Sequence, residues 1–137
     1  MQPISRHFQA AVAEDARRLL ETFAHTTPGV ALAVLTSADG FEIAAHPRGL
    51  PTAQRLAAMS SSLQALSEAM AGEAGLEGIR NLVIESDGGT VIVLGVAKLT
   101  PRLSLTVVSR GDETLGRLLW ASRECCASLE RRLLAID

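Results

Sequence analysis

The sequence predicts an α/β fold of the α+β type, in which a five-stranded antiparallel sheet is sandwiched between helices. Strand-like runs are joined by short turns at Asp39-Gly40 and Asp87-Gly88, which is typical of antiparallel hairpins. The run at residues 30–35 is apolar at every position, as expected of a strand with both faces covered. A three-layer arrangement of helix, sheet and helix satisfies both observations.

Length and composition favour one globular domain spanning residues 1–137. Hydrophobic residues make up 47% of the chain and charged residues 20%, which is enough apolar surface for a sizeable core. Aromatic residues are only 3%, with no Tyr, which argues against a carbohydrate site or a base-stacking platform. The 13 basic and 15 acidic residues give a net charge of −2, so no basic field exists to hold nucleic acid.

The N-terminal residues carry no apolar run of the signal-peptide type, and turns interrupt the apolar strands before they reach membrane-spanning length. We therefore expect a cytoplasmic protein without membrane insertion. Cys125 and Cys126 are adjacent in a helical pattern and lack the spacing of a metal or redox motif. We expect both to be reduced packing residues.

The element order follows from periodicity and turn residues. An amphipathic helix over residues 4–24 precedes two strands. A middle helix, capped by Thr52, precedes three more strands, and Asp112 caps the last helix. The expected strands are 30–36, 41–45, 81–86, 90–99 and 103–109, and the middle helix is 52–71. The buried stripe of the last helix comprises Leu115, Leu118, Leu119, Ser122, Cys125, Cys126, Leu129, Leu133 and Ile136.

The middle helix carries more apolar and small residues than one sheet face requires. Its large apolar residues recur every three or four positions and form a seam of Leu56, Met59, Leu63, Leu66 and Met70. A neighbouring stripe of small residues holds Ala58, Ser62, Ala65 and Ala69. The polar remainder is Ser60, Gln64, Ser67 and Glu68. This pattern fits a well-buried helix in a crowded monomer, and it also fits a helix that packs on a partner helix.

Several of these features together resemble the Roadblock (dynein light chain) family, over roughly residues 28–134. They are the element order, the Ala38-Asp39-Gly40 turn, the Ser/Ala-rich middle helix and the strand pair around Asp87-Gly88-Gly89. The resemblance implies that two copies join through residues 53–71 and 81–86 into one continuous sheet. The implied dimer interface comprises Leu56, Met59, Ser62, Leu63, Leu66, Met70, Leu82, Val83 and Ile84.

The resemblance also implies a function. Bacterial relatives bind a Ras-like small GTPase, and some stimulate its GTP hydrolysis by reshaping its switch regions. We therefore expect a non-enzymatic homodimeric regulator or scaffold. The polar side of the middle helix, Ser60, Gln64, Ser67 and Glu68, is the expected docking surface for the GTPase.

No motif points to chemistry, so we expect no catalytic residue, cofactor or metal. The glycines at 111 and 116 lack the Lys-Ser/Thr of a phosphate loop, and His7, His25 and His46 lack ligand spacing. Two alternative functions remain open. One is a small sensory ligand-binding domain, which needs a pocket between sheet and helices. The other is an assembly scaffold without GTPase contact.

Overall fold

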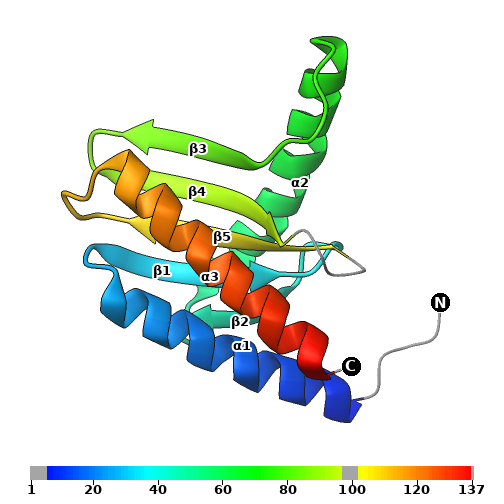
Figure 1. Cartoon of the computed structure of the whole chain (residues 1–137), viewed down its shortest axis with the longest axis vertical. Coiled ribbons are helices and arrows are strands. Elements are labelled where there is room, and N and C mark those ends of the chain that lie inside the picture. Colours follow the sequence, from blue (N-terminus) through cyan, green and yellow to red (C-terminus); the bar gives the residue numbers. More distant parts are fainter. Residues whose placement is uncertain (1–5, 97–101, 137) are drawn as a thin grey trace.

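The computed structural model of the chain describes residues 6–96 and 102–136, and the predicted element order is confirmed (Figure 1). The bounds are α1 (Arg6–Thr26), β1 (Val30–Thr36), β2 (Glu42–His46), α2 (Pro51–Glu73), β3 (Asn81–Ser86), β4 (Gly89–Val96), β5 (Leu103–Ser109) and α3 (Leu115–Ile136). The predicted strand 90–99 is thus observed to residue 96, and residues 97–99 lie outside the described residues. None of the described helices is long and apolar enough to cross a membrane.

The five strands form one antiparallel sheet in the order β2-β1-β5-β4-β3. This order is not a simple meander, because α2 carries the chain from β2 at one edge to β3 at the other (Figure 1). Strand β1 pairs with β2 on one side and with the central strand β5 on the other. As a result, the sheet has two free edges in the described structure, one at β2 and one at β3.

Helices cover both faces of the sheet, as predicted. Helices α1 and α3 pack on one face and α2 on the other (Figure 1). Side chains of β1 alternate between the two layers, with Ala33 and Leu35 in the α1–α3 core and Leu32 and Val34 in the α2 core. The apolar run at residues 30–35 is therefore explained by burial on both sides.

The helix starts differ from the predicted ones. Helix α2 begins after Leu50 with Pro51 in its first turn and no side-chain cap, so the prediction that Thr52 caps it is wrong. Helix α3 is capped by Thr114 rather than Asp112. The Thr114 hydroxyl accepts a hydrogen bond of 3.3 Å from the Arg117 N–H. The predicted buried stripe of α3 is confirmed, with Leu118, Cys125 and Leu129 in the core; the Ile136 side chain lies outside the described residues.

Candidate interaction surface

Helix α2 touches the sheet with only part of its length. Its buried residues are Ala53, Ala57 and Ser60, which lie on one face in the first half of the helix. This half packs on β1, β2 and β5. The second half extends past the β3 edge of the sheet (Figure 1). Small side chains at the contact let the helix lie close to the strands. The large apolar residues of α2 lie on other sides of the helix.

Part of the polar side of α2 faces the sheet, so the prediction that Ser60 belongs to an outward docking surface is wrong. Ser60 is only 2% exposed, and its hydroxyl lies 2.6 Å from that of Thr106 on β5. Gln64 and Ser67 are half-buried above β3 and β4. Glu68 is exposed, but it pairs with Arg102. A buried hydroxyl that finds a partner costs little, so a polar stripe can face a sheet that offers one.

The large apolar residues of α2 are exposed instead. Met59, Leu63, Leu66 and Met70 are between 37% and 66% exposed. Leu56, nearer the start of the helix, packs at the margin of the α2 core. A run of four exposed large apolar residues on one side of a helix is unusual for a surface that always faces water.

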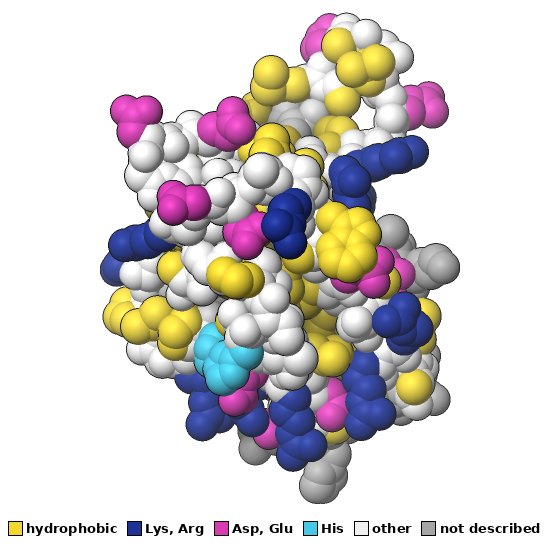
Figure 2. Space-filling model, turned by 60° about the vertical axis from the view of Figure 1, so that its left-hand side comes forward, with side chains coloured by type: hydrophobic (Ala, Val, Ile, Leu, Met, Phe, Trp, Pro, Cys, Tyr) yellow, Lys and Arg dark blue, Asp and Glu magenta, His cyan; other side chains and the backbone are white. Residues whose placement is uncertain are grey.

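Strand β3 adds apolar residues on the same side of the sheet. Ile92 and Leu94 of β4 belong to the α1–α3 core, and Val83 lies opposite Ile92 and packs on that core. Leu82 and Ile84 alternate with Val83, so they point to the α2 face. We call Met59, Leu63, Leu66, Met70, Leu82 and Ile84 the α2–β3 apolar surface. Figure 2 shows hydrophobic side chains around the projecting end of α2, whereas basic side chains gather at the opposite end of the molecule.

The free edge of β3 has little of the usual protection against pairing. The strand has six residues, Asn-Leu-Val-Ile-Glu-Ser, with no Pro, no Lys and one charged side chain. Edges that must stay unpaired are commonly blocked by such residues or by a covering element. The α2–β3 apolar surface and this edge adjoin each other, so one partner can cover both.

The small-residue stripe of α2 is also exposed. Ala58, Ser62, Ala65 and Ala69 lie on the side of the helix that faces away from the sheet. We call these four residues the outer stripe. Near its start, Gly40 of the β1–β2 turn packs on Ala58 and Ser61, and the Ser61 hydroxyl donates a hydrogen bond of 3.2 Å to the Ala38 carbonyl. The predicted turn therefore anchors α2 on the sheet.

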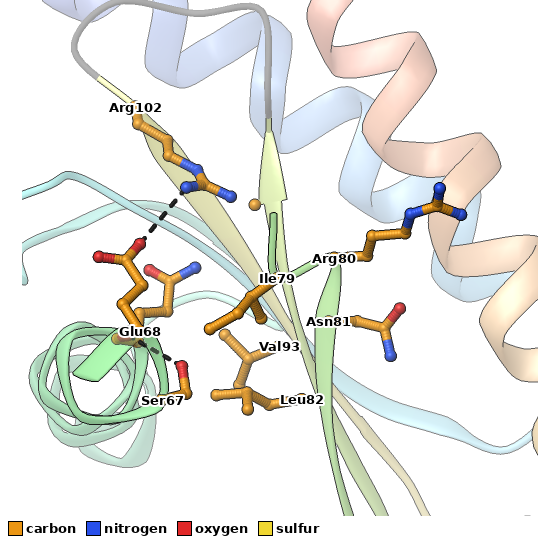
Figure 3. Close-up of a pocket in the computed structure, with 10 residues that line it drawn as sticks. Ser67, Glu68, Ile79, Arg80, Asn81, Leu82, Val93 and Arg102 are labelled. Atoms are coloured by element: carbon orange, nitrogen blue, oxygen red, sulfur yellow. Dashed lines mark hydrogen bonds and ion pairs between the residues drawn. The ribbon is translucent and has the colours of Figure 1, made fainter. Parts of the chain in front are cut away.

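Arg102 links the projecting half of α2 to the sheet (Figure 3). Its guanidinium lies over Gly95 of β4, where a Cβ would overlap it, and reaches Glu68 at 3.5 Å. Beneath this pair lies a hollow lined by Ser67, Leu82 and Val93. Its volume is only about 10 Å³, which has room for at most one water molecule. This hollow is far smaller than a ligand pocket of roughly 300 Å³ or more, so it is not itself a site for a small molecule.

The sequence could not show which of the three sides of α2 faces the sheet. Periodicity locates stripes on a helix, and it does not say which stripe is inside when several are apolar or small. One signal was present in β5, where Thr106 stands between the buried apolar residues Leu105 and Val107 and requires a hydrogen-bonding partner. The contact between Arg102 and Gly95 could not be predicted from the sequence, in which the one indication was a glycine within a strand.

These features define a class of small helix–sheet–helix protein in which a free sheet edge lies beside a helix with exposed apolar side chains. The Roadblock/LC7 domain family model matches residues 18–109. The chain belongs to that family.

Solved structures have the same fold. A Roadblock/LC7 domain from Streptomyces avermitilis is 21% identical, with a TM-score of 0.76 over 86% of this chain and 97% of that one. The gliding protein MglB from Thermus thermophilus is 22% identical, with a TM-score of 0.74 over 88% and 90% of the two chains. MglB from Myxococcus xanthus is 14% identical, with a TM-score of 0.73 over 100% and 97%. No curated protein matches the chain by sequence.

Proposed function

We propose that the protein is a homodimer that pairs through its α2–β3 apolar surface. The observation that carries this proposal is the exposure of Met59, Leu63, Leu66 and Met70 beside a free strand edge. Fully burying a side chain of this size contributes about 1.5–3 kcal/mol. Antiparallel pairing of β3 with the partner's β3 joins the two sheets and satisfies both edges at once. Of the interface predicted from the sequence, Val83 contributes backbone only, since its side chain faces the α1–α3 core.

We further propose that the dimer is a non-enzymatic regulator that binds a Ras-like small GTPase. The family resemblance supports this partner. The outer stripe supports the location of the GTPase-binding site, because pairing through the α2–β3 apolar surface would set the two outer stripes side by side on one face of the dimer. Ala58, Ser62, Ala65 and Ala69 carry no charge and little bulk, so a partner's backbone can approach closely. A single GTPase across the two-fold axis would block a second one.

In this proposal the protein acts by preferring one conformation of the GTPase switch regions. No residue of the chain is assigned to the hydrolytic reaction. A partner that favours one state shifts the equilibrium only by its difference in affinity for the two states. Moving a switch from 1:99 to 99:1 requires roughly a 10⁴-fold difference in affinity. Faster GTP hydrolysis follows where the preferred state is the one that orients the attacking water.

The test titrates the purified protein with the small GTPases encoded in the same genome, each loaded with GDP or with a non-hydrolysable GTP analogue. We expect one GTPase to bind with a preference for one nucleotide. Ala65→Arg in the outer stripe should weaken binding at least tenfold, and Ala11→Arg, at an exposed position on α1, should not. Single-turnover hydrolysis with and without the dimer measures stimulation.

Two results would separate this function from the scaffold alternative. A dimer that binds none of these GTPases in either nucleotide state would favour a scaffold without GTPase contact. Binding that survives Ala65→Arg would move the docking site away from the outer stripe while leaving the partner class intact.

A further inference from the structure

A second surface lies at the opposite edge of the sheet, along β2. A groove of about 320 Å³ runs between this strand and α1. Its lining includes Glu42, Ile43, Ala44 and Ala45, which are consecutive in the chain. Ala44 packs in the α1–α3 core and Ala45 in the α2 core, so these two neighbours point to opposite faces of the sheet. A groove that touches both must run along the backbone edge of the strand. That edge has no strand beside it in the described part of the chain.

The opposite wall of the groove is a face of α1 with small side chains at its start. Ala10 and Ala13 lie three residues apart, and Glu14 and Arg17 continue the same face. Small residues let another backbone come close to the helix. Helix α1 packs along β2 (Figure 1), so its side chains form a wall beside the free strand edge.

Charges at the groove are placed unevenly. The Oε1 atom of Glu42 is buried and accepts no hydrogen bond from any described residue. Arg17 does not serve it, because its guanidinium is held by Glu14 at 2.9 Å and Glu21 at 2.8 Å. Arg48, two residues beyond the end of β2, is exposed and also lines the groove. The Thr36 hydroxyl, on the residue that pairs with Glu42, is likewise buried without a partner among the described residues. The groove thus has one unsatisfied carboxylate oxygen at one end and an exposed guanidinium toward the other.

We propose that this groove binds an extended peptide segment of a partner protein, which adds to β2 as a sixth strand. Main-chain hydrogen bonds to the free edge would supply affinity, as in other cases of strand addition. The segment carries a Lys or Arg that reaches Glu42 and an Asp or Glu near Arg48, with small or β-branched residues between them. A buried acceptor without a partner costs about 1–3 kcal/mol, so a cation that satisfies it binds selectively.

This site is independent of the proposed dimer and of GTPase binding. β2 and β3 are at opposite edges of the sheet, and the outer stripe is on the α2 face. A peptide in the β2 groove therefore leaves the α2–β3 apolar surface free. It also follows that loss of peptide binding and loss of the dimer can be measured separately.

The experiment selects phage-displayed random octapeptides on the full-length protein, with counter-selection on Ala13→Leu, whose larger side chain fills the groove. We expect enrichment of segments with a basic residue at one end and an acidic residue at the other. Synthetic labelled copies of the selected peptide should bind at least tenfold more weakly to Ala13→Leu and to Glu42→Gln. Ala11→Leu, outside the groove, is the matched control. Circular dichroism verifies that each variant is folded.

Arg48→Glu gives an independent test, since this exposed side chain can change without disturbing the core. It should reverse the charge preference at the acidic end of the peptide. Amide exchange should slow at residues 42–46 and not at residues 81–86 when peptide binds. Absence of enrichment, or binding equal in Ala13→Leu and wild type, overturns the proposal. A tetramer of this chain that Ala13→Leu abolishes would also overturn it, because the occupant would then be a second copy.

Discussion

Ser60 on α2 and Thr106 on β5 lie 46 residues apart in the chain and share a hydrogen bond of 2.6 Å between their hydroxyl groups. Both side chains are almost wholly buried, at 2% and 1% exposure. This contact sits where α2 crosses the sheet, and it fixes the rotation of the helix about its axis. The rotation in turn determines that Met59 and Leu63 point away from the core.

Removing one partner of this hydrogen bond should destabilise the fold. Ser60→Ala leaves the Thr106 hydroxyl buried without a partner, and we expect a loss of about 1–3 kcal/mol in the free energy of unfolding. The double variant Ser60→Ala/Thr106→Val should lose less than the sum of the single changes, because no unsatisfied hydroxyl remains. Urea unfolding at one fixed protein concentration measures both. Additive losses would show that the two hydroxyl groups act independently.

A charge in the α2–β3 apolar surface should separate the subunits without unfolding them. Leu63 is 37% exposed in the isolated chain, so Leu63→Asp buries its carboxylate only in the dimer. We expect wild type to be a dimer at micromolar concentration by light scattering. Leu63→Asp should be a monomer with the same far-ultraviolet circular dichroism. A monomeric wild type would contradict the proposed pairing.

The fold was largely predictable because its signals are local. The paired strands around Asp39-Gly40 and Asp87-Gly88 and the stripe of α3 through Leu118 and Leu129 depend on neighbours in sequence, and the structure confirms them. The side of α2 that faces the sheet was not predictable, since it depends on the long-range contact between Ser60 and Thr106. The capping of α3 by Thr114 was missed for a different reason, because Asp112 and Thr114 are both good cap residues and lie only two residues apart.

Two glycines should respond in opposite ways to Ala. Gly29 has a φ of +92°, and a Cβ there would lie 2.7 Å from the Gly111 Cα. Gly29→Ala should therefore cost about 1–3 kcal/mol from its backbone conformation, and more from the displaced loop. Gly72 lies in α2 with open space around it, so Gly72→Ala should stabilise by up to about 1 kcal/mol. Thermal unfolding of both variants at equal concentration gives the comparison; equal effects would contradict this account.

Acid should weaken the ion pairs on α1. Hydrogen bonds from Arg17, with its positive charge, lower the pKa of Glu14 from 4.5 to about 2. A lowered pKa means that the carboxylate stabilises the folded state above pH 4.5, and that this contribution is lost as the pH falls toward 2. Glu14→Gln should be less stable than wild type at pH 6 and equal to it near pH 2. Carbon NMR of the Glu14 carboxyl measures the midpoint, and a value near 4.5 would contradict the pairing.

Both thiols should be unreactive in the folded protein. Burial raises the pKa of Cys126 to about 12, and it also raises the pKa of Cys125. Because the thiolate is the reactive form, a disulfide reagent at pH 8 should modify neither residue in the native state and both in guanidinium chloride. Cys125→Ala should lower stability while leaving the dimer intact. Rapid labelling of native protein would indicate that α3 opens or that a thiol is accessible.

The positions of β2 and β3 at opposite edges of one sheet determine how many partner-binding sites the proposed dimer would have. Pairing through β3 would put both of those edges in the middle of the joined sheet and leave a β2 edge at each far end. The assembled protein would then offer two identical grooves that point in opposite directions. A partner with one binding segment would be held in two copies, and a partner with two such segments would gain avidity only if its linker spans the whole joined sheet. Linker length in the partner would decide between clamping one molecule and crosslinking two.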